Sequence, residues 1–363
     1  MNDEAALPGT ANAGALPRTI DEAAPPRRIN EVALPRFVQI EPVGQCNLRC
    51  RMCPVQFRGE GLPGRPRAFM DFDAYCRLID QFPQLAELQL QGLGEPFLHP
   101  RFFDMVHYAA ARGILVSTNT NLTVLTEARA EECVQSGLRV LHASLDGAGA
   151  ATFESIRLGA RFERVLRNLR RLVAARRRLG SALPEIRLVA VVMRANLHEL
   201  PDLVRLARRE GVPDISVQHL CHDFGESTLP AQYRPMRDFV ERESLQGDDP
   251  HRVERYFAAA RAAAHELGVA LRLPNVKPRT HPPGTPGRTR CDWPWRGAYI
   301  SYDGKAMPCC MVATPDRVHF GDMAQSGVAA VWNNADYTAF RERLDSDTPP
   351  EVCRSCAVYA GIF

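Results

Sequence analysis

Three cysteines near the start of the chain have the spacing of metal ligands. Cys46, Cys50 and Cys53 form a C-x3-C-x2-C pattern directly after a strand-like run at 37–41. Three thiolates on one short loop can bind three irons of a [4Fe–4S] cluster and leave the fourth iron without a protein ligand. Such an open position lets a substrate or cofactor bind the metal directly. A zinc knuckle, or three unrelated thiols, is the alternative interpretation of this spacing.

A second group of cysteines lies in the last quarter of the chain. It consists of Cys291, Cys309, Cys310, Cys353 and Cys356. A hairpin signal, Tyr302-Asp303-Gly304, separates Cys291 from Cys309, and Cys353 and Cys356 form a C-x2-C pair. Four such thiols can enclose a second cluster completely, and a four-thiolate zinc site is the alternative. The hairpin geometry favours Cys309 as the ligand, with its neighbour Cys310 as the alternate.

Composition limits the class of protein. The chain has 363 residues, 45% of them hydrophobic, and a net charge of +3, which gives no general indication of nucleic acid or anionic membrane as a partner. It has no apolar run long enough to span a bilayer and no secretory signal pattern. We therefore expect a soluble, cytoplasmic protein. In a reducing compartment, eleven cysteines favour metal ligation over disulfides.

The order of the predicted elements indicates an α/β fold. Residues 1–35 are rich in proline and alanine and predict a disordered tail. Strand patterns at 37–41, 85–91, 114–118, 139–145, 186–192 and 214–220 alternate with helical patterns at 71–82, 100–112, 126–136, 161–179 and 198–210. This alternation predicts right-handed crossovers and a parallel sheet, with too few units to close an eight-stranded barrel. We expect a partial (βα)6 TIM-like barrel over residues 36–230.

Two further segments follow this predicted core. Residues 231–287 are expected to be a helical segment and a Pro/Gly-rich linker, and residues 288–363 a small α+β unit. The basic helix at 161–179 could bind RNA. Because no aromatic residues interleave with its arginines, a solvated outer face is favoured instead.

Several motifs resemble those of one superfamily. The cysteine triplet resembles the signature of the radical S-adenosylmethionine (radical SAM) enzymes, and Gly92-Leu93-Gly94-Glu95-Pro96 resembles their Gly-Gly-Glu-Pro motif, with Leu93 in place of a glycine. The C-terminal cysteines resemble the twitch domain, a short form of the SPASM iron–sulfur domain with one auxiliary cluster. The resemblance implies two [4Fe–4S] clusters, S-adenosyl-L-methionine, and an electron donor such as flavodoxin or ferredoxin. It also implies the partial-barrel fold.

The same resemblance implies which residues bind S-adenosylmethionine. Gly92, Gly94 and Glu95 would hold its amino group, and Ser144 and Arg157 its carboxylate. Thr118 or Asn119 would lie near the ribose. Met52 and Met193 would lie near the adenine, although Met193 could equally be an ordinary core residue.

Residues after the sixth predicted strand are candidates for proton transfer to or from a substrate. His219, His222 and Asp223 are expected near the barrel mouth. For His219, a hydrogen-bonded position in the core is the alternative. We expect His99, in the Glu-Pro-Phe-Leu-His loop, to make a structural hydrogen bond.

The predicted function is a radical SAM reaction on a substrate C–H bond. The single auxiliary cluster is similar to that of the 2-deoxy-scyllo-inosamine dehydrogenases, which implies oxidation of a small polar metabolite such as a sugar or cyclitol alcohol. One alternative is a maturase that modifies a ribosomally synthesised peptide. The other is a metal-stabilised binding scaffold without turnover, which zinc in place of iron would favour.

Overall fold

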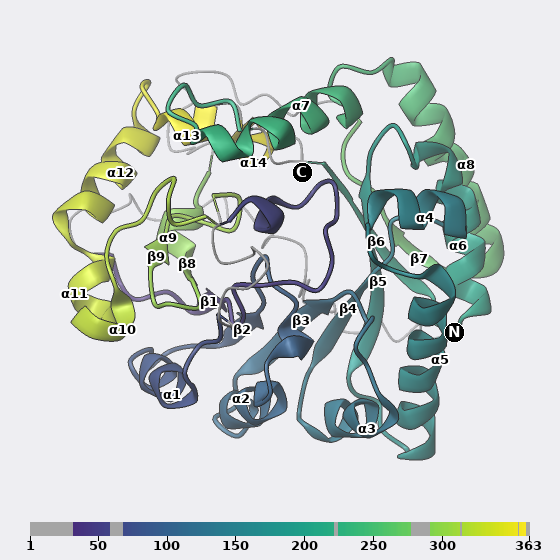
Figure 1. Ribbon diagram of the computed structural model, residues 1–363, viewed down its shortest axis with the longest axis horizontal. Helices are drawn as coiled ribbons and strands as arrows, with labels where there is room; N and C mark the ends of the chain where they lie inside the picture. Colours follow the sequence, from purple (N-terminus) through teal and green to yellow (C-terminus); the bar gives the residue numbers. More distant parts are fainter. Residues whose placement is uncertain are drawn as a thin grey trace, which may run out of the picture.

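The computed structural model describes residues 32–58, 68–220, 224–276, 291–312, 314–354 and 356–360. Within these residues the strands form one nine-stranded sheet in the order β7-β6-β5-β4-β3-β2-β1-β8-β9, and only the β8–β9 pair is antiparallel (Figure 1). The strands are β1 (Phe37–Ile40), β2 (Glu87–Leu90), β3 (Leu115–Thr120), β4 (Val140–Ser144), β5 (Glu185–Val192), β6 (Asp214–His219), β7 (Ala270–Arg272), β8 (Gly297–Ile300) and β9 (Ala306–Met307).

The helices of the core follow the strands in the predicted alternation. Figure 1 shows α1, α2, α3 and α5 in succession along the outer side of the sheet. Asp71 and Thr126 cap α1 and α3 by accepting a backbone N–H, which explains where these helices begin. The helices of the core are α1 (Phe72–Asp80), α2 (Phe102–Ala110), α3 (Glu127–Gln135), α4 (Ala150–Ile156), α5 (Phe162–Arg178), α6 (Leu200–Arg209), α7 (Arg234–Glu243) and α8 (Pro250–Leu267), with the short 3₁₀ turns η1 (Pro54–Phe57), η3 (Pro96–Leu98), η4 (Leu197–Glu199) and η5 (Ala231–Tyr233).

The two faces of the sheet differ in polarity, because successive side chains of a strand point to opposite faces. On β2, Leu88 and Leu90 are buried, whereas Gln89 lies on the opposite face and is partly exposed. The strand register puts Gln89 on the same face as Gln39 of β1 and Ser117 of β3. The apolar face packs against the helices, so the polar face is the inner face of the partial barrel.

The C-terminal unit continues the same sheet. β8 pairs in parallel with β1, and β8 and β9 form the predicted hairpin. Trp332 is buried and its indole N–H is 3.1 Å from the carbonyl oxygens of both Val32 and Ala33, so the chain just before β1 contacts this unit. Its helices are α9 (Trp293–Arg296), α10 (Met323–Ser326), α11 (Val328–Trp332), α12 (Ala335–Asp345), α13 (Glu351–Arg354) and α14 (Ala357–Ala360).

Some predicted features fall on residues that the structure does not describe. Residues 1–31 of the predicted tail, residues 277–287 of the predicted linker, and both His222 and Asp223 lie outside the described residues. Among the helices that the structure describes, none combines the length and apolarity needed to cross a membrane.

Candidate functional site

The cysteine triplet lies on the loop that leaves the carboxyl end of β1. Backbone hydrogen bonds fix this loop against the segment after α4: the Arg49 N–H donates to the Leu158 carbonyl at 2.9 Å and the Arg51 N–H to the Ile156 carbonyl at 3.0 Å. In open α/β sheets, ligands bind outside the carboxyl ends of the strands. The loop therefore holds its three thiols at the edge where chemistry is expected.

A buried ion pair closes the base of this loop. Arg58 donates through Nη1 to both carboxylate oxygens of Glu41, at 3.0 and 3.1 Å, and both side chains are at most 2% exposed. Glu41 also accepts the backbone N–H of Leu93 at 2.9 Å. The pair thus joins the two ends of the cysteine loop to the Gly92–Pro96 loop. Sequence reasoning missed it because no spacing rule relates residues 41 and 58.

Gly94 is required by close packing between these two loops. A Cβ atom at this position would lie 1.9 Å from the Val43 carbonyl oxygen and 2.7 Å from that of Gln45. The next residue, Glu95, donates its backbone N–H to the same Gln45 carbonyl at 2.9 Å. The glycine therefore lets the backbone approach the cysteine loop directly.

The Glu95 carboxylate is buried at the carboxyl end of β3. It accepts hydrogen bonds from the Thr120 hydroxyl at 2.6 Å, the Asn121 N–H at 2.8 Å and the Phe97 N–H at 3.1 Å. Burial raises the pKa of Glu95, although these three donors act in the opposite direction. A carboxylate held in this way has a fixed orientation next to the cysteine loop.

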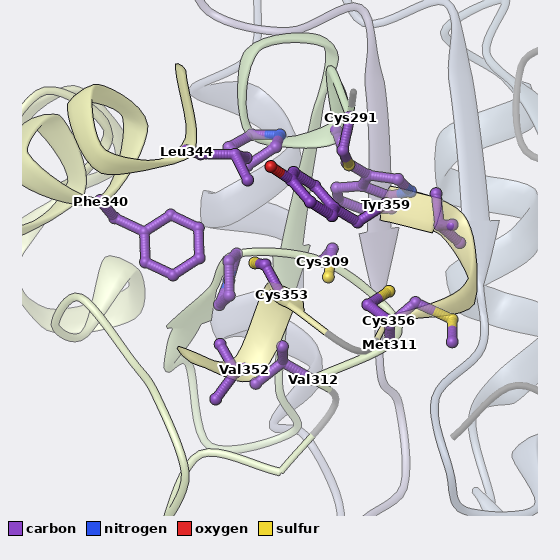
Figure 2. Close-up of a pocket in the computed structure, with 14 residues that line it drawn as sticks. Cys291, Cys309, Met311, Val312, Phe340, Leu344, Val352, Cys353, Cys356 and Tyr359 are labelled. Carbon is purple, nitrogen blue, oxygen red and sulfur yellow. The ribbon is translucent and has the colours of Figure 1, made fainter. Parts of the chain in front are cut away.

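The C-terminal cysteines line a second, separate site. Figure 2 shows Cys291, Cys309, Cys353 and Cys356 around one pocket, and none of the three N-terminal thiols contributes to it. Cys309 is among the residues that line this pocket and Cys310 is not. The remaining wall is largely apolar and includes Trp293, Pro308, Val312, Phe340, Leu344 and Val352.

Burial affects the protonation of thiols in both cysteine groups. Burial raises the pKa of Cys53 to about 12 and that of Cys291 well above its usual range, so binding a metal must displace protons from both. Across the described part of the chain, no group of three or more His, Cys, Asp or Glu side chains is close enough together to hold one metal ion.

Family models match the two parts of the chain that contain these cysteine groups. A family model described as the radical SAM superfamily matches residues 40–207, and one described as an iron–sulfur cluster-binding domain, SPASM, matches residues 291–357. The chain belongs to the radical SAM superfamily. It is therefore a radical SAM enzyme that uses a [4Fe–4S] cluster and S-adenosylmethionine, and its SPASM domain adds a further iron–sulfur cluster.

Individual relatives cover most of the chain. A tungsten-containing aldehyde ferredoxin oxidoreductase cofactor-modifying protein of Pyrococcus furiosus is 28% identical over 89% of this chain and 87% of its own length. A PqqA peptide cyclase of Xanthomonas euvesicatoria is 26% identical over 88% and 79%. SuiB of Streptococcus suis, solved with its precursor peptide SuiA, matches 92% of this chain and 72% of its own with a TM-score of 0.66 and 15% identity, which shows a shared fold.

The two residues expected near the ribose, Thr118 and Asn119, lie on opposite faces of β3. Thr118 is fully buried on the helix-facing side of β3, and its hydroxyl donates to the Leu90 carbonyl at 2.9 Å. Asn119 points to the opposite, inner face, and its side-chain oxygen has no hydrogen-bond partner among the described residues. Thr118 is therefore a structural residue, and only Asn119 is placed to contact a ligand.

Arg157 is held by a buried carboxylate. Its Nε is 2.6 Å from Oδ2 of Asp146, and Asp146 Oδ1 accepts the Val191 N–H at 2.7 Å. Ser144, expected to share a ligand with Arg157, ends β4 on the inner face of the sheet. The Asp146 partner was not predicted, although it lies two residues after Ser144.

Both methionines expected near the adenine are buried, Met52 on the cysteine loop and Met193 just after β5. Asn196 fixes the second position: it accepts the Met193 N–H at 2.8 Å and donates to the carbonyls of Asp146 and Val191, each at 2.9 Å. The ends of β4 and β5 are thereby tied together. Asn196 is a further residue that sequence reasoning missed.

The expectation that His219 faces the barrel mouth is not supported by its position. Its register partner is Val192 of β5, on the helix-facing side of the sheet, and its ring lies 6.5 Å from that of Phe257 in α8. Its Nε2 is 2.8 Å from the Asn275 carbonyl oxygen. Alternation along β6 puts this side chain among the core residues, so the hydrogen-bonded core alternative describes it. His99 makes the expected structural contact, at 2.9 Å from the Met70 carbonyl.

Proposed function

We propose that Cys46, Cys50 and Cys53 hold the cluster that binds S-adenosylmethionine, and that the four C-terminal thiols hold an auxiliary [4Fe–4S] cluster. The observation that carries this proposal is the division of the thiols: three lie on a loop at the carboxyl edge of the sheet, and Cys291, Cys309, Cys353 and Cys356 line a separate pocket. Three ligands leave one iron open, whereas four close the cluster.

When bound, the cluster and S-adenosylmethionine supply a 5′-deoxyadenosyl radical that takes a hydrogen atom from a substrate C–H bond. The residues of the chain orient the cofactor for this chemistry. Glu95 is proposed to accept from the amino group, because its carboxylate is fixed by three donors beside the cysteine loop. Arg157, held by Asp146, is proposed to pair with the carboxylate, since a guanidinium binds a carboxylate through two parallel hydrogen bonds.

Asn119, Ser144, Met52 and Met193 complete the proposed cofactor site. Asn119 offers a buried side-chain oxygen on the inner face of β3, which suits a ribose hydroxyl. Both methionines are buried and can pack against an adenine ring while excluding water from the reacting centre.

For the substrate, we favour a small polar metabolite such as a sugar or cyclitol alcohol. The inner face of the sheet supports this class, because the strand register and alternation place hydrogen-bonding side chains along it. They include Asn119, His142, Ser144, Ser216 and Gln218. Oxidation of an alcohol also requires an acceptor for a second electron, and the pocket lined by four thiols is the proposed location of that acceptor.

Modification of a peptide is the second candidate function. The names of two matched proteins favour it, because one is a PqqA peptide cyclase and the other was solved with a precursor peptide. A peptide would also meet the polar inner face through its amide groups.

An electron donor such as flavodoxin or ferredoxin is the proposed redox partner. Two exposed arginines support an acidic donor. Arg51 lies on the cysteine loop itself, and Arg161, whose side chain is 79% exposed and forms an ion pair with Glu154 at 2.9 Å, follows the Ile156–Leu158 segment that pairs with this loop. Positive charge beside a redox centre favours the approach of an acidic partner.

The proposal is tested by anaerobic reconstitution of the full chain, followed by iron analysis and incubation with S-adenosylmethionine and dithionite. We expect about eight irons per chain, from two four-iron clusters, and formation of 5′-deoxyadenosine. Cys50→Ala should lose about half of the iron and all of the cleavage. Cys356→Ala should also lose about half of the iron but keep the cleavage, because its cluster is the other one. Cys76→Ala, on helix α1, is the matched control and should change neither quantity.

Two outcomes of this experiment would count against the proposal. Equal loss of cleavage in Cys50→Ala and Cys76→Ala, or zinc in place of iron, would contradict the proposed catalytic cluster. Supplying deuterated polyols and, separately, peptides then distinguishes the substrate classes. Deuterium should appear in 5′-deoxyadenosine only with the class that is the substrate.

A further inference from the structure

Asn121 is placed directly against one of the three N-terminal thiols. It follows the last residue of β3, is 6% exposed, and its Nδ2 lies 3.6 Å from Sγ of Cys46. Its backbone N–H donates to Glu95 at 2.8 Å, so the residue is anchored to the Gly92–Pro96 loop. The side chain therefore approaches the sulfur from a fixed backbone position.

Neighbouring groups determine which way the Asn121 amide faces. Its Oδ1 accepts from the Thr123 N–H at 2.9 Å and from the Thr123 hydroxyl at 2.6 Å. Its Nδ2 donates to Asn47 Oδ1 at 3.1 Å, and Asn47 in turn donates to the Thr123 hydroxyl at 2.7 Å. A flipped amide would oppose donor to donor at Thr123. The N–H groups of Asn121 must consequently face Asn47 and the thiol.

The backbone around Asn121 is also specialised. Leu122 has φ of +58°, a left-handed conformation that favours glycine. It is kept there by two hydrogen bonds, from Asn168 Nδ2 to its carbonyl at 2.6 Å and from its own N–H to the Thr120 hydroxyl at 3.1 Å. Strained backbone that its surroundings hold in place is concentrated at functional sites. Here the strain turns the chain so that Asn121 and Thr123 both face the cysteine loop.

We propose that Asn121 is a positioning residue that donates a hydrogen bond to the Cys46 sulfur and raises the reduction potential of the cluster. The inference rests on the proposed ligation by Cys46. Reduction makes the cluster and its thiolates more negative, so an N–H donor stabilises the reduced form more than the oxidised one. Cys46 also receives the Leu48 N–H at 3.4 Å, which makes Asn121 the side-chain donor of a two-donor pair.

The test compares the midpoint potentials of reconstituted full-length variants by anaerobic redox titration. The reading is taken from the electron paramagnetic resonance signal that changes when S-adenosylmethionine is added. Asn121→Leu removes the donor, and Asn121→Asp also adds a negative charge. We expect the equilibrium constant for reduction of the cluster to fall by about tenfold for Asn121→Leu, which lowers the midpoint potential by about 59 mV for one electron. The potential should fall further for Asn121→Asp. Ser136→Ala is the control, because Ser136 is a buried polar residue whose hydroxyl bonds only to backbone groups at the end of α3, and its midpoint should stay at the wild-type value.

The outcomes separate this inference from the proposed function. Absence of a signal that responds to S-adenosylmethionine in the wild type would refute the cluster assignment itself. An unchanged midpoint in either Asn121 variant at wild-type iron content would overturn only the role of Asn121. If both variants lose iron, Thr123→Val tests whether the Asn121 hydrogen bond raises the midpoint potential. This change removes the hydroxyl that orients the Asn121 amide and leaves the donor in place. A lowered midpoint then supports the inference, and an unchanged one overturns it.

Discussion

At the scale of single residues, buried carboxylates that pair with arginines connect segments far apart in the sequence. These pairs are Glu41 with Arg58, Asp146 with Arg157, and Glu226 with Arg317. Removing one partner of a buried pair leaves an unpaired buried charge, which destabilises a protein by roughly 3–5 kcal/mol. Each of these pairs lies beside a loop assigned to one of the two cluster sites, so its loss should affect both folding and the site.

The Asp146–Arg157 pair gives the first prediction. Asp146→Asn should weaken the binding of S-adenosylmethionine by about tenfold, because Arg157 loses the group that orients it. Equilibrium dialysis of the anaerobically reconstituted variant measures this affinity. Asp104→Asn, which breaks an exposed ion pair with Arg101, is the control and should leave the affinity unchanged. Wild-type affinity in a folded Asp146→Asn variant would exclude Arg157 from the proposed carboxylate contact.

His99 gives a prediction for the pH dependence of stability. Its Nδ1 accepts the Arg101 N–H at 3.1 Å, so its proton is on Nε2, which faces the Met70 carbonyl. Burial lowers the pKa of His99 below the value of about 6.5 expected in the unfolded chain. The unfolded state therefore binds more protons as the pH falls below 6.5, and the free energy of unfolding should decrease there.

Thermal unfolding between pH 5 and 8 measures this effect. His99→Gln keeps a donor for Met70 and cannot titrate, so its stability should fall less on acidification than that of the wild type. The buried His219, whose pKa is also lowered by burial, remains in both proteins and contributes equally to both profiles. Parallel profiles for the variant and the wild type would contradict the assignment of this pH dependence to His99.

At the scale of elements, close approach of two loops sets the position of the N-terminal thiols. Gly94→Ala should displace the cysteine loop, because the added Cβ would lie 1.9 Å from the backbone oxygen of Val43 and 2.7 Å from that of Gln45. We expect the variant to fold but to retain less than about half of the iron of its N-terminal site. Gly247→Ala is the control, because a Cβ at that exposed glycine meets nothing within 4 Å and its backbone is not in the left-handed region. Wild-type iron content in Gly94→Ala would show that the loop does not depend on this contact.

The elements themselves could be predicted from the sequence to a large extent, because hydrophobic periodicity and turn residues are local signals. The first six parallel strands lie within or close to the predicted ranges, and the hairpin β8–β9 was indicated by Tyr302-Asp303-Gly304. Helix α4 was not predicted, since its seven residues are too few to show a helical period. The parallel pairing of β8 with β1 was not predicted either, because it joins strands about 260 positions apart with no local signature.

The candidate site was predictable only where residue type and spacing carry the chemistry. The cysteine groups and the Gly92–Pro96 motif could be found in this way. Asn121 lies two residues after Asn119, but its contact with Cys46 was not predicted because it depends on the left-handed Leu122, which no propensity predicts. The choice between Thr118 and Asn119, and between the barrel mouth and the core for His219, stayed open in the sequence because one position along a strand decides which face of the sheet a side chain occupies.

At the scale of the whole molecule, the C-terminal unit contacts the core at several places. Two of them bear on the cluster sites: the β1–β8 pairing and a set of contacts made by the segment 224–237. Glu226 of this segment forms an ion pair at 2.5 Å with Arg317 of the C-terminal unit, and both side chains are at most 4% exposed. The Tyr233 hydroxyl of the same segment donates to Asp316 at 3.0 Å. The second place links the region after β6 to the loop that follows Cys309 and Cys310, so the two cluster sites belong to one packed structure.

The Glu226–Arg317 pair provides a test of this coupling. Glu226→Leu and Arg317→Met should each lower the free energy of unfolding by roughly 3–5 kcal/mol, because each leaves the other charge buried alone. The double variant replaces the pair by apolar side chains and should be more stable than the sum of the two single changes implies. Anaerobic urea unfolding, followed by both circular dichroism and iron release, measures the three values against the wild type. Additive losses would mean that the pair does not couple the core to the C-terminal unit, and the β1–β8 contact would then be the connection that holds the auxiliary site in place.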